Sequence, residues 1–228
     1  MYVKQIATVG LVAASVIWAA AAHAATITIG SALNGGGITT RASGTDAAST
    51  GSFSAGMGWN ANIVTGQTAA APDIFNSTSQ NTTNGGSTAA LDIFVTASNL
   101  TSPVGSVPFL STFTTNAVPS GWTVTESTFL DARNTVFGTT TSLGSDAFTG
   151  IDTGSALTIA AVTAPYSITQ EYIIRANGIS GSANSTMDVS AVPIPGTLPL
   201  FASGLGALGL LRWRKKRKAP KSALPLTA

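Results

Sequence analysis

The stretch Ser167–Ala176 reads Ser-Ile-Thr-Gln-Glu-Tyr-Ile-Ile-Arg-Ala and predicts the fold class. Apolar residues recur in it at even spacings, namely Ile168, Tyr172 and Ile174. Polar residues stand at odd spacings from these, namely Thr169, Glu171 and Arg175. Successive side chains of a β-strand point to opposite faces, so the pattern predicts a strand with one face on a core and the other in water.

Short runs of the same kind precede and follow this stretch, bounded by Gly, Asn, Asp and Pro, without long helical periodicity. In one of them Leu91, Ile93 and Val95 alternate with Asp92 and Thr96. The predicted strands are Thr26–Ile29, Gly51–Phe53, Met57–Val64, Ala89–Ala97, Phe109–Thr115, Trp122–Phe129, Thr135–Phe137, Ala156–Val162, Ser167–Ala176 and Met187–Val192. Many short strands separated by turn residues predict an all-β fold with a single β-sandwich-like domain over residues 25–191.

Three segments rich in Gly, Asn, Ser and Thr are predicted as loops. They are Asn34–Gly37, Ser77–Ser87 and Gly178–Ser185. Asn-Gly and Gly-Gly steps supply the positive φ angles that tight turns need. The many hydroxyls of Ser77–Ser87 fit a polar surface loop, with O-glycosylation as the alternative.

Residues 1–24 have the features of a secretory signal peptide. Lys4 precedes an apolar stretch from Ile6 to Ala22, and Ala22-His23-Ala24 places small side chains where a signal peptidase requires them. We therefore expect cleavage after Ala24, with Ala25 as the first residue of the exported protein. The alternative is an uncleaved N-terminal anchor.

The tail 192–218 combines a proline-containing motif, an apolar run and a basic cluster. The motif is Val192, Pro193, Ile194, Pro195 and Gly196, and the run Leu198–Leu211 carries no charge. A helix from Gly196 to Trp213 would be ~27 Å long, enough to cross a thin bilayer core. The cluster comprises Arg212, Arg214, Lys215, Lys216, Arg217 and Lys218. Basic residues are retained on the cytoplasmic side, so residues 219–228 are predicted as a cytoplasmic tail and the domain lies outside.

This order of elements resembles the PEP-CTERM sorting signal of Gram-negative envelope proteins. In that family a short proline motif, a transmembrane helix and an Arg-rich end are recognised by an exosortase. Here Ile194 occupies the position of the family's glutamate, and Val-Pro-x-Pro-Gly looks like a variant of the signal. The resemblance covers about the last thirty residues. It implies an exosortase-type partner, an inner-membrane intermediate, and delivery to the cell surface or the exopolysaccharide matrix. A permanent tail anchor is the alternative.

Composition removes most catalytic and metal-binding classes. The chain has no cysteine, and its one histidine, His23, lies in the predicted signal peptide. Thiol and imidazole catalysis, and metal sites built on those ligands, are therefore excluded for the exported part. Residues 25–191 hold three basic residues against nine acidic ones, a formal net charge of −6, which argues against nucleic-acid binding. We predict no cofactor.

Two carboxylate pairs are weak candidates for a site. Asp146 and Asp152 flank a Gly- and Ser-rich segment and could offer oxygen ligands to calcium, although no known calcium-loop pattern surrounds them, and a solvated turn is favoured. Glu126 and Asp131 could form a glycosidase pair, since such enzymes need only two carboxyl groups. Solvated strand ends are the favoured interpretation here too.

Four large aromatic residues could stack on sugar rings if they were exposed: Trp59, Trp122, Tyr166 and Tyr172. In strand patterns such residues more often pack in the core. The sequence therefore predicts a non-enzymatic exported protein of the cell surface or exopolysaccharide matrix. The alternatives are a permanently anchored glycan-binding adhesin and a secreted hydrolase that uses a carboxylate pair.

Overall fold

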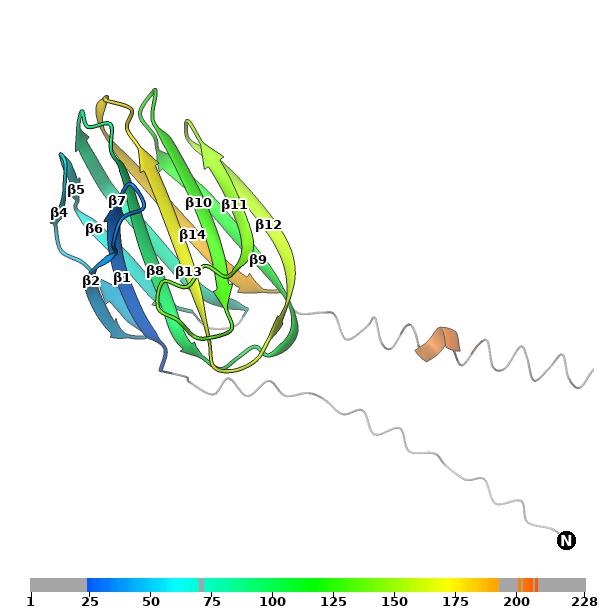
Figure 1. The fold of residues 1–228 in the computed structure, drawn as a ribbon. Helices are drawn as coiled ribbons and strands as arrows, with labels where there is room; N and C mark the ends of the chain where they lie inside the picture. The colour runs from blue at the N-terminus through cyan, green and yellow to red at the C-terminus, as the bar shows by residue number, and fades with distance from the viewer. Residues whose placement is uncertain (1–23, 70–71, 193–200, 202, 207, 209–228) are drawn as a thin grey trace, which may run out of the picture.

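A computed structural model describes residues 24–69, 72–192, 201, 203–206 and 208. Its described residues form an all-β domain of fourteen strands (Figure 1). The strands are β1 (Thr26–Leu33), β2 (Thr39–Thr45), β3 (Ala47–Ser49), β4 (Phe53–Gly56), β5 (Trp59–Ala61), β6 (Ile63–Thr68), β7 (Asp73–Gly85), β8 (Ala90–Leu100), β9 (Gly105–Ala117), β10 (Thr123–Asp131), β11 (Thr141–Phe148), β12 (Asp152–Val162), β13 (Tyr166–Arg175) and β14 (Ser180–Ala191). The predicted all-β class is confirmed.

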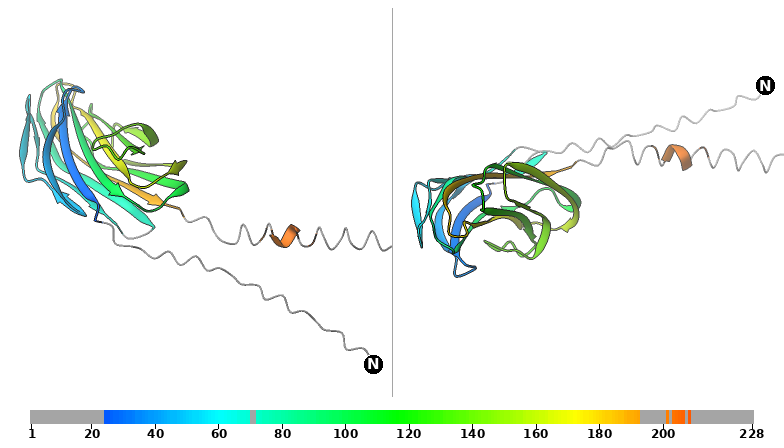
Figure 2. Two further views of the ribbon diagram at one scale, coloured as in Figure 1. Left: turned by 60° about the horizontal axis from the view of Figure 1, so that its bottom comes forward. Right: turned by 90° about the horizontal axis from the view of Figure 1, so that it is seen from above.

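The strands form two antiparallel sheets that curl and pack face to face (Figure 2). The six-stranded sheet has the order β11-β10-β13-β8-β1-β2. The eight-stranded sheet has the order β12-β9-β14-β7-β5-β4, with β6 paired to β7 and β3 paired to β6. The inner faces share one apolar core, so the domain is a β-sandwich in which each sheet also has an outer face.

The stretch that predicted the fold class is strand β13, in the six-stranded sheet between β10 and β8. As predicted, Ile168, Tyr172 and Ile174 face the core and are at most 1% exposed. The opposite face departs from the prediction, because Thr169 is also fully buried. The segment 132–140 crosses that outer face and covers it. Phe137, which lies in this segment, donates its N–H to Thr96 Oγ1 at 3.1 Å.

Two predicted loops are strands. Ser77–Ser87 falls largely within β7 and Gly178–Ser185 largely within β14, and these strands pair with each other inside the eight-stranded sheet. Threonine favours strands because its branched side chain packs well on a pleated surface, so a hydroxyl-rich stretch need not be a loop. Asn34–Gly37 is a turn as predicted, with positive φ at Asn34 and Gly35.

Other boundaries also differ from the prediction. Thr135–Phe137 is not a strand but part of the covering segment, and Phe137 has a φ of 61°. The predicted strand Met57–Val64 is divided into β5 and β6 after a turn at Met57, whose φ is 48°. Strands β2, β3 and β11, rich in Ser, Thr, Gly and Ala, were not predicted.

The described domain begins and ends at the same end of the sandwich, which we call the proximal end (Figure 1). There the Ala25 N–H donates to Asp46 Oδ1 at 2.9 Å, and the Val192 N–H donates to the Pro108 carbonyl at 2.9 Å. The turn at Asn34–Gly37 lies at the opposite, distal end, after the full length of β1. Both ends of the described domain therefore lie on the side away from this turn.

Most of the predicted signals lie outside the described residues. These are residues 1–23 with Ala22, the motif residues Pro193–Gly196 and the basic cluster 212–218. A short helical segment is described at 201, 203–206 and 208, where Phe201, Leu205 and Leu208 are exposed. Within the described part of the chain, no helix has both the length and the hydropathy to cross a bilayer.

Candidate functional site

A β-bulge aims Arg41 at the opening between the two sheets. Strands β1 and β2 pair regularly except that Ile29 pairs with Ala42 while the next residue, Gly30, pairs with Thr40. Arg41 is thus the extra residue of β2. Without the bulge it would point to the face opposite Ala42, whereas a bulge bends the strand and re-aims its side chain. The Arg41 guanidinium lies on the inner side, beside Ser31.

Two contacts hold the guanidinium in place. Its Nε–H donates to Ser31 Oγ at 2.8 Å, and its central carbon lies 4.8 Å from the centre of the Phe53 ring. Phe53 belongs to β4 at the edge of the other sheet. A cation over an aromatic face is attracted by the ring quadrupole. Arg41 therefore joins the edges of the two sheets, and its orientation is fixed before any ligand arrives.

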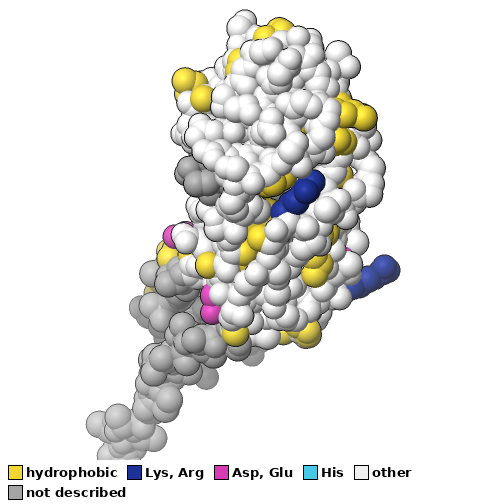
Figure 3. Space-filling model, turned by 90° about the vertical axis from the view of Figure 1, so that its left-hand side faces the viewer, with side chains coloured by type: hydrophobic (Ala, Val, Ile, Leu, Met, Phe, Trp, Pro, Cys, Tyr) yellow, Lys and Arg dark blue, Asp and Glu magenta, His cyan; other side chains and the backbone are white. Residues whose placement is uncertain are grey.

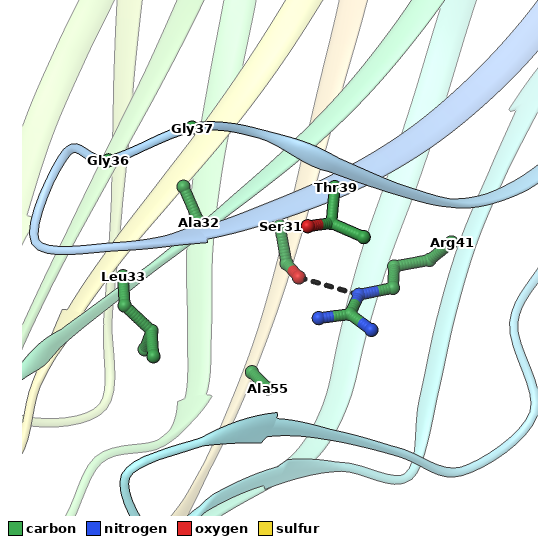
Figure 4. A pocket seen from close by; sticks show the side chains of 8 residues that line it. All are labelled: Ser31, Ala32, Leu33, Gly36, Gly37, Thr39, Arg41 and Ala55. Carbon is green, nitrogen blue, oxygen red and sulfur yellow. Dashed lines mark hydrogen bonds between the residues drawn. The ribbon is translucent and has the colours of Figure 1, made fainter.

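The guanidinium lines an open pocket of about 230 Å³ in the distal half of the sandwich (Figure 4). Figure 3 shows the side of the domain at which β2 and β4 lie in Figure 1, and basic side chains are few on it. The pocket lining consists of Ser31, Ala32, Leu33, Gly36, Gly37, Thr39, Arg41 and Ala55. No carboxylate belongs to this lining, so Arg41 supplies its only formal charge.

The outer nitrogens of Arg41 remain uncommitted. Among the described residues, none accepts a hydrogen bond from Nη1 or Nη2, and no carboxylate forms an ion pair with Arg41. These nitrogens carry donors in one plane, which match a bidentate acceptor such as a carboxylate or a phosphate. The arrangement can bind an anion, but the lining contains no carboxylate, imidazole or amine that could act as a general base on the Ser31 or Thr39 hydroxyl.

The aromatic candidates do not form a sugar-binding surface. Trp59, Trp122, Tyr166 and Tyr172 are each at most 1% exposed. The two indole rings pack edge to face, 5.4 Å apart, and each donates its N–H to a backbone carbonyl. The Tyr172 and Ser77 hydroxyls join the two sheets through a hydrogen bond of 2.8 Å. The core interpretation, which the sequence favoured, is confirmed.

The carboxylates Glu126 and Asp131 lie on opposite faces of β10. Glu126 points into the sandwich, where its Oε2 accepts a hydrogen bond from the Thr114 N–H at 3.0 Å. Asp131 points outward beneath the covering segment, where its Oδ1 accepts from the Arg133 N–H at 2.7 Å. Side chains alternate between the two faces along a strand, so two residues five positions apart point to opposite faces. The proposed glycosidase pair is corrected on this ground, and the solvated strand end is wrong for both residues, since each is buried.

Burial raises the pKa of Glu126 to about 7. The neighbouring Ser185 hydroxyl and the Thr114 N–H oppose this rise, whereas the nearby Asp146 carboxylate adds to it. The Ser185 hydroxyl lies outside hydrogen-bond geometry, and Glu126 Oε1 has no hydrogen-bond partner among the described residues. A fully buried carboxyl group without access to solvent cannot serve an external substrate, so Glu126 belongs to the core.

Asp146 lies within β11 and Asp152 begins β12, on either side of the turn by which the chain passes from one sheet to the other, and both carboxylates accept hydrogen bonds from the backbone. Asp146 Oδ1 accepts from Ala147 N–H and Asp152 Oδ1 from Thr153 N–H, each at 2.8 Å. Within the described ranges there is no cluster of three or more His, Cys, Asp or Glu residues that could hold a metal ion. The favoured interpretation, a solvated turn, fits Asp152, which is exposed at the start of β12, but not Asp146, which is half-buried within β11 and pairs with Glu126.

Sequence reasoning missed Arg41 as a site residue. Its one signal was rarity, since only Arg41, Arg133 and Arg175 are basic in residues 25–191. The bulge that turns Arg41 inward leaves no mark in the sequence, and the pocket needs β4, which is distant from the β1–β2 turn along the chain. The sequence showed that Arg41 is one of few basic residues, but it did not show where its side chain points.

Comparison with known proteins gives little similarity. No protein-family model and no curated protein matches the chain. Among solved structures, the enzymatically active domain of bacteriophage CBA120 tailspike protein 4 matches 57% of this chain at 14% identity with a TM-score of 0.31. The match covers 18% of the tailspike chain. TmCBM61 in complex with beta-1,4-galactotriose matches 56% of this chain and 77% of its own at 9% identity, with a TM-score of 0.24. At these scores neither structure bears on the ligand or the reaction of this chain.

Proposed function

We propose that this chain is an exported, non-enzymatic glycan-binding protein of the cell surface or the exopolysaccharide matrix of a Gram-negative bacterium. A signal peptide directs its export, and the tail 192–218 holds it in the inner membrane until an exosortase-type enzyme cuts near the motif Val192–Gly196. The released domain then associates with matrix polysaccharide.

The position of the pocket relative to the ends of the domain is the observation that carries this proposal. Ala25 and Val192 lie at the proximal end, whereas the Arg41 pocket lies in the distal half beside the turn Asn34–Gly37. A domain tethered through Val192 would therefore present the pocket away from the membrane. Presentation of this kind suits a protein that binds an extracellular polymer before or after its tail is removed.

The chemistry of the described residues supports binding rather than catalysis. The pocket has a single cation and no general base to activate its two hydroxyls, and the buried carboxyl of Glu126 is closed to substrates. Glu126 and Asp131 diverge, which weakens the hydrolase alternative. The permanently anchored adhesin differs from our proposal only in the fate of the tail.

The test is the mass and location of the protein in its own host. A tagged protein is followed in membrane and matrix fractions, and the released species is weighed. We expect the matrix form to begin at Ala25 and to lack Leu198–Leu211 and the basic cluster. A matrix form that still carries Trp213 would show that the tail is a simple anchor, and a form that begins at Met1 would refute the signal peptide.

Two tail variants sharpen this experiment. Replacing Pro193 and Pro195 together with Ala should leave export intact and trap the full-length protein in the inner membrane, because the rigid extended segment offered to the enzyme is lost. Replacing Arg214–Lys218 with neutral residues should instead disturb orientation and retention before any cleavage. Normal release of the proline variant would contradict recognition of the motif.

A further inference from the structure

We propose that the Arg41 pocket binds the carboxylate of a uronic acid residue, so that the glycan recognised is an acidic polysaccharide. This inference rests on the proposed function and names the ligand class of the same site. Its basis is the fixed and uncommitted guanidinium of Arg41 at the mouth between the sheets.

The free edge of the guanidinium has the geometry of a carboxylate receptor. Since Nε already donates to Ser31 Oγ, the donors left over are on Nη1 and Nη2. These two nitrogens can each donate to one oxygen of a planar carboxylate, which is the bidentate pairing that arginine favours. The contacts to Ser31 and Phe53 hold the plane in place, so little side-chain entropy is lost when the ligand binds.

Arg41 differs in this respect from the other two basic residues of the domain. Arg133 and Arg175 make no side-chain hydrogen bond to any described residue and do not belong to the lining of the Arg41 pocket. Their guanidinium groups therefore lack the fixed orientation of Arg41. The three residues carry the same charge, so any ligand that needs only positive charge would not distinguish among them.

The domain is acidic, so non-specific electrostatic attraction of a polyanion to it is weak. Residues 25–191 have a formal net charge of −6, and long-range forces on an acidic polymer are repulsive until salt screens them beyond about 8–10 Å. Attraction must come from short-range contact with one arginine. We therefore expect binding to depend on a defined carboxylate rather than on total ligand charge, unlike binding by a polybasic surface.

The size of the pocket restricts how much of the ligand it holds. Its volume of about 230 Å³ lies below the roughly 300–1,000 Å³ of pockets that enclose drug-sized ligands. One sugar residue with its carboxylate suits this space, while the rest of the chain continues across the open surface. Thr39 and Ser31 hydroxyls and the backbone at Gly36 and Gly37 are the polar groups available to the sugar ring.

The test compares tri-galacturonate with its carboxyl-reduced, neutral form. Binding to the protein recovered from its host is measured by calorimetry for the wild type and for Arg41→Gln. We expect tri-galacturonate alone to bind, and Arg41→Gln to bind it about 10- to 100-fold more weakly, the effect of losing a charge-assisted hydrogen-bonded pair. Arg175→Gln changes the net charge equally and should bind as the wild type does.

Further variants and ligands separate the explanations. Ala55→Leu adds bulk to the pocket lining while residue 41 stays an arginine, and it should also weaken binding, which keeps the test valid if Arg41→Gln misfolds. A sulfated, carboxylate-free trisaccharide that binds as well as tri-galacturonate would overturn the carboxylate assignment. Equal loss in Arg41→Gln and Arg175→Gln would overturn the pocket.

The proposed function can fail separately. Retention of the host's own exopolysaccharide by both wild type and Arg41→Gln would leave glycan binding intact and refute this inference. Absence of binding to that exopolysaccharide and to every oligosaccharide would refute both.

Discussion

The outer faces of the two sheets carry similar rows of hydroxyl side chains, but the rows differ in burial and in hydrogen bonding. Across the six-stranded sheet the register aligns Ser43, Thr28, Thr96 and Thr169 on neighbouring strands. Across the eight-stranded sheet it aligns Ser49, Thr65, Thr78, Thr186, Thr114 and Thr153. We call these the covered row and the open row.

Residues of the covered row bind one another and the segment above them. The Thr96 and Thr169 hydroxyls hydrogen-bond at 2.9 Å, the Thr28 and Ser43 hydroxyls at 3.4 Å, and Thr96 Oγ1 also accepts from the Phe137 N–H. The Phe137 ring packs against the Phe94 ring, with the ring centres 5.9 Å apart. Thr96 and Thr169 are fully buried as a result.

The open row lies at the surface with its hydroxyls almost uncommitted. Thr65, Thr78, Thr114 and Thr153 make no side-chain hydrogen bond to any described residue. Ser49 Oγ donates to the carbonyl of the adjacent Thr50 at 3.2 Å, and Thr186 only accepts a long hydrogen bond from Asn116 at 3.5 Å. Ser49 and Thr153 at the two ends of the row are exposed, and the threonines between them are half-buried. The same residue type therefore contributes to stability on one sheet and stays available to solvent or a partner on the other.

The largest expected effect comes from Glu126, a polar group buried between the sheets and not on an outer face. Its Oε2 accepts a hydrogen bond, but its Oε1 has no hydrogen-bond partner among the described residues. Its folded pKa of about 7 exceeds the ordinary value of 4.5, so the folded state holds a proton that the unfolded state has lost between these pH values. The free energy of unfolding should fall by about 3 kcal/mol from pH 4.5 to 7 and level off above, at 1.36 kcal/mol per pH unit. Urea unfolding across this range measures it.

Glu126→Gln is the matched variant for that prediction. Glutamine has the shape of the protonated acid and does not ionise, so the variant should lose most of the slope and exceed the wild type in stability above pH 7. Asp152→Asn removes a negative charge at an exposed position and should keep the slope. A wild type whose stability rises from pH 4.5 to 7 would contradict the burial of an acid at this place.

Phe137→Ala tests the cover directly and should have the next largest effect. The ring is half-buried against Phe94 and the backbone of Gly30, where a Cβ would lie only 2.6 Å from Phe137 Cζ. Full burial of a phenylalanine is worth about 3–5 kcal/mol, so we expect a loss of about 2 kcal/mol in thermal or urea unfolding. Ile159→Ala, on the outer face of the other sheet and 70% exposed, should change stability by less than about 0.5 kcal/mol. Equal losses would show that the faces do not differ.

The two rows can also be compared through one substitution. Thr96→Val removes the hydroxyl that accepts from the Phe137 N–H and that hydrogen-bonds to the Thr169 hydroxyl. We expect the free energy of unfolding to fall by about 1–3 kcal/mol. Thr78→Val on the open row removes a hydroxyl that has no protein partner and should stay within about 0.5 kcal/mol of the wild type. Both changes keep a β-branched side chain, so strand propensity is conserved. A large loss for Thr78→Val would mean that its hydroxyl is bonded in solution.

The parts of the fold that the sequence predicted are those in which apolar and polar residues alternate. Strands β8 and β13 were predicted on that ground and lie where expected. Much of β7 and the first half of β14 were taken for loops because their inward residues include Ser77, Ser79 and Ser185, which are buried although they are polar. The second half of β14 was predicted as the strand Met187–Val192. Composition identifies solvent exposure poorly when hydroxyls fill a core.

The sites were less predictable because they depend on register. Glu126 and Asp131 could have been separated by counting, since an odd spacing within one strand directs them to opposite faces. Arg41 could not have been placed, because an extra residue in β2 reverses the direction that alternation assigns to it. A covering segment such as 132–140 likewise cannot be inferred from the strands beneath it.

The smallest expected effect comes from Asp188, the one carboxylate in the row next to the open row. It aligns with Asn76 on β7 and Thr112 on β9. Partial burial and the negative charge of Asp73 raise its pKa, while Asn76 opposes the rise. The sign is that of Glu126, so Asp188→Asn should remove a minor part of the fall in stability as pH rises, a fraction of the effect of Glu126→Gln, because water still screens a half-buried group. Titration of its carboxyl by NMR measures the shift directly. A pKa as high as that of Glu126 would mean that this face is covered in solution as fully as the other, and the distinction between the two sheets would fail.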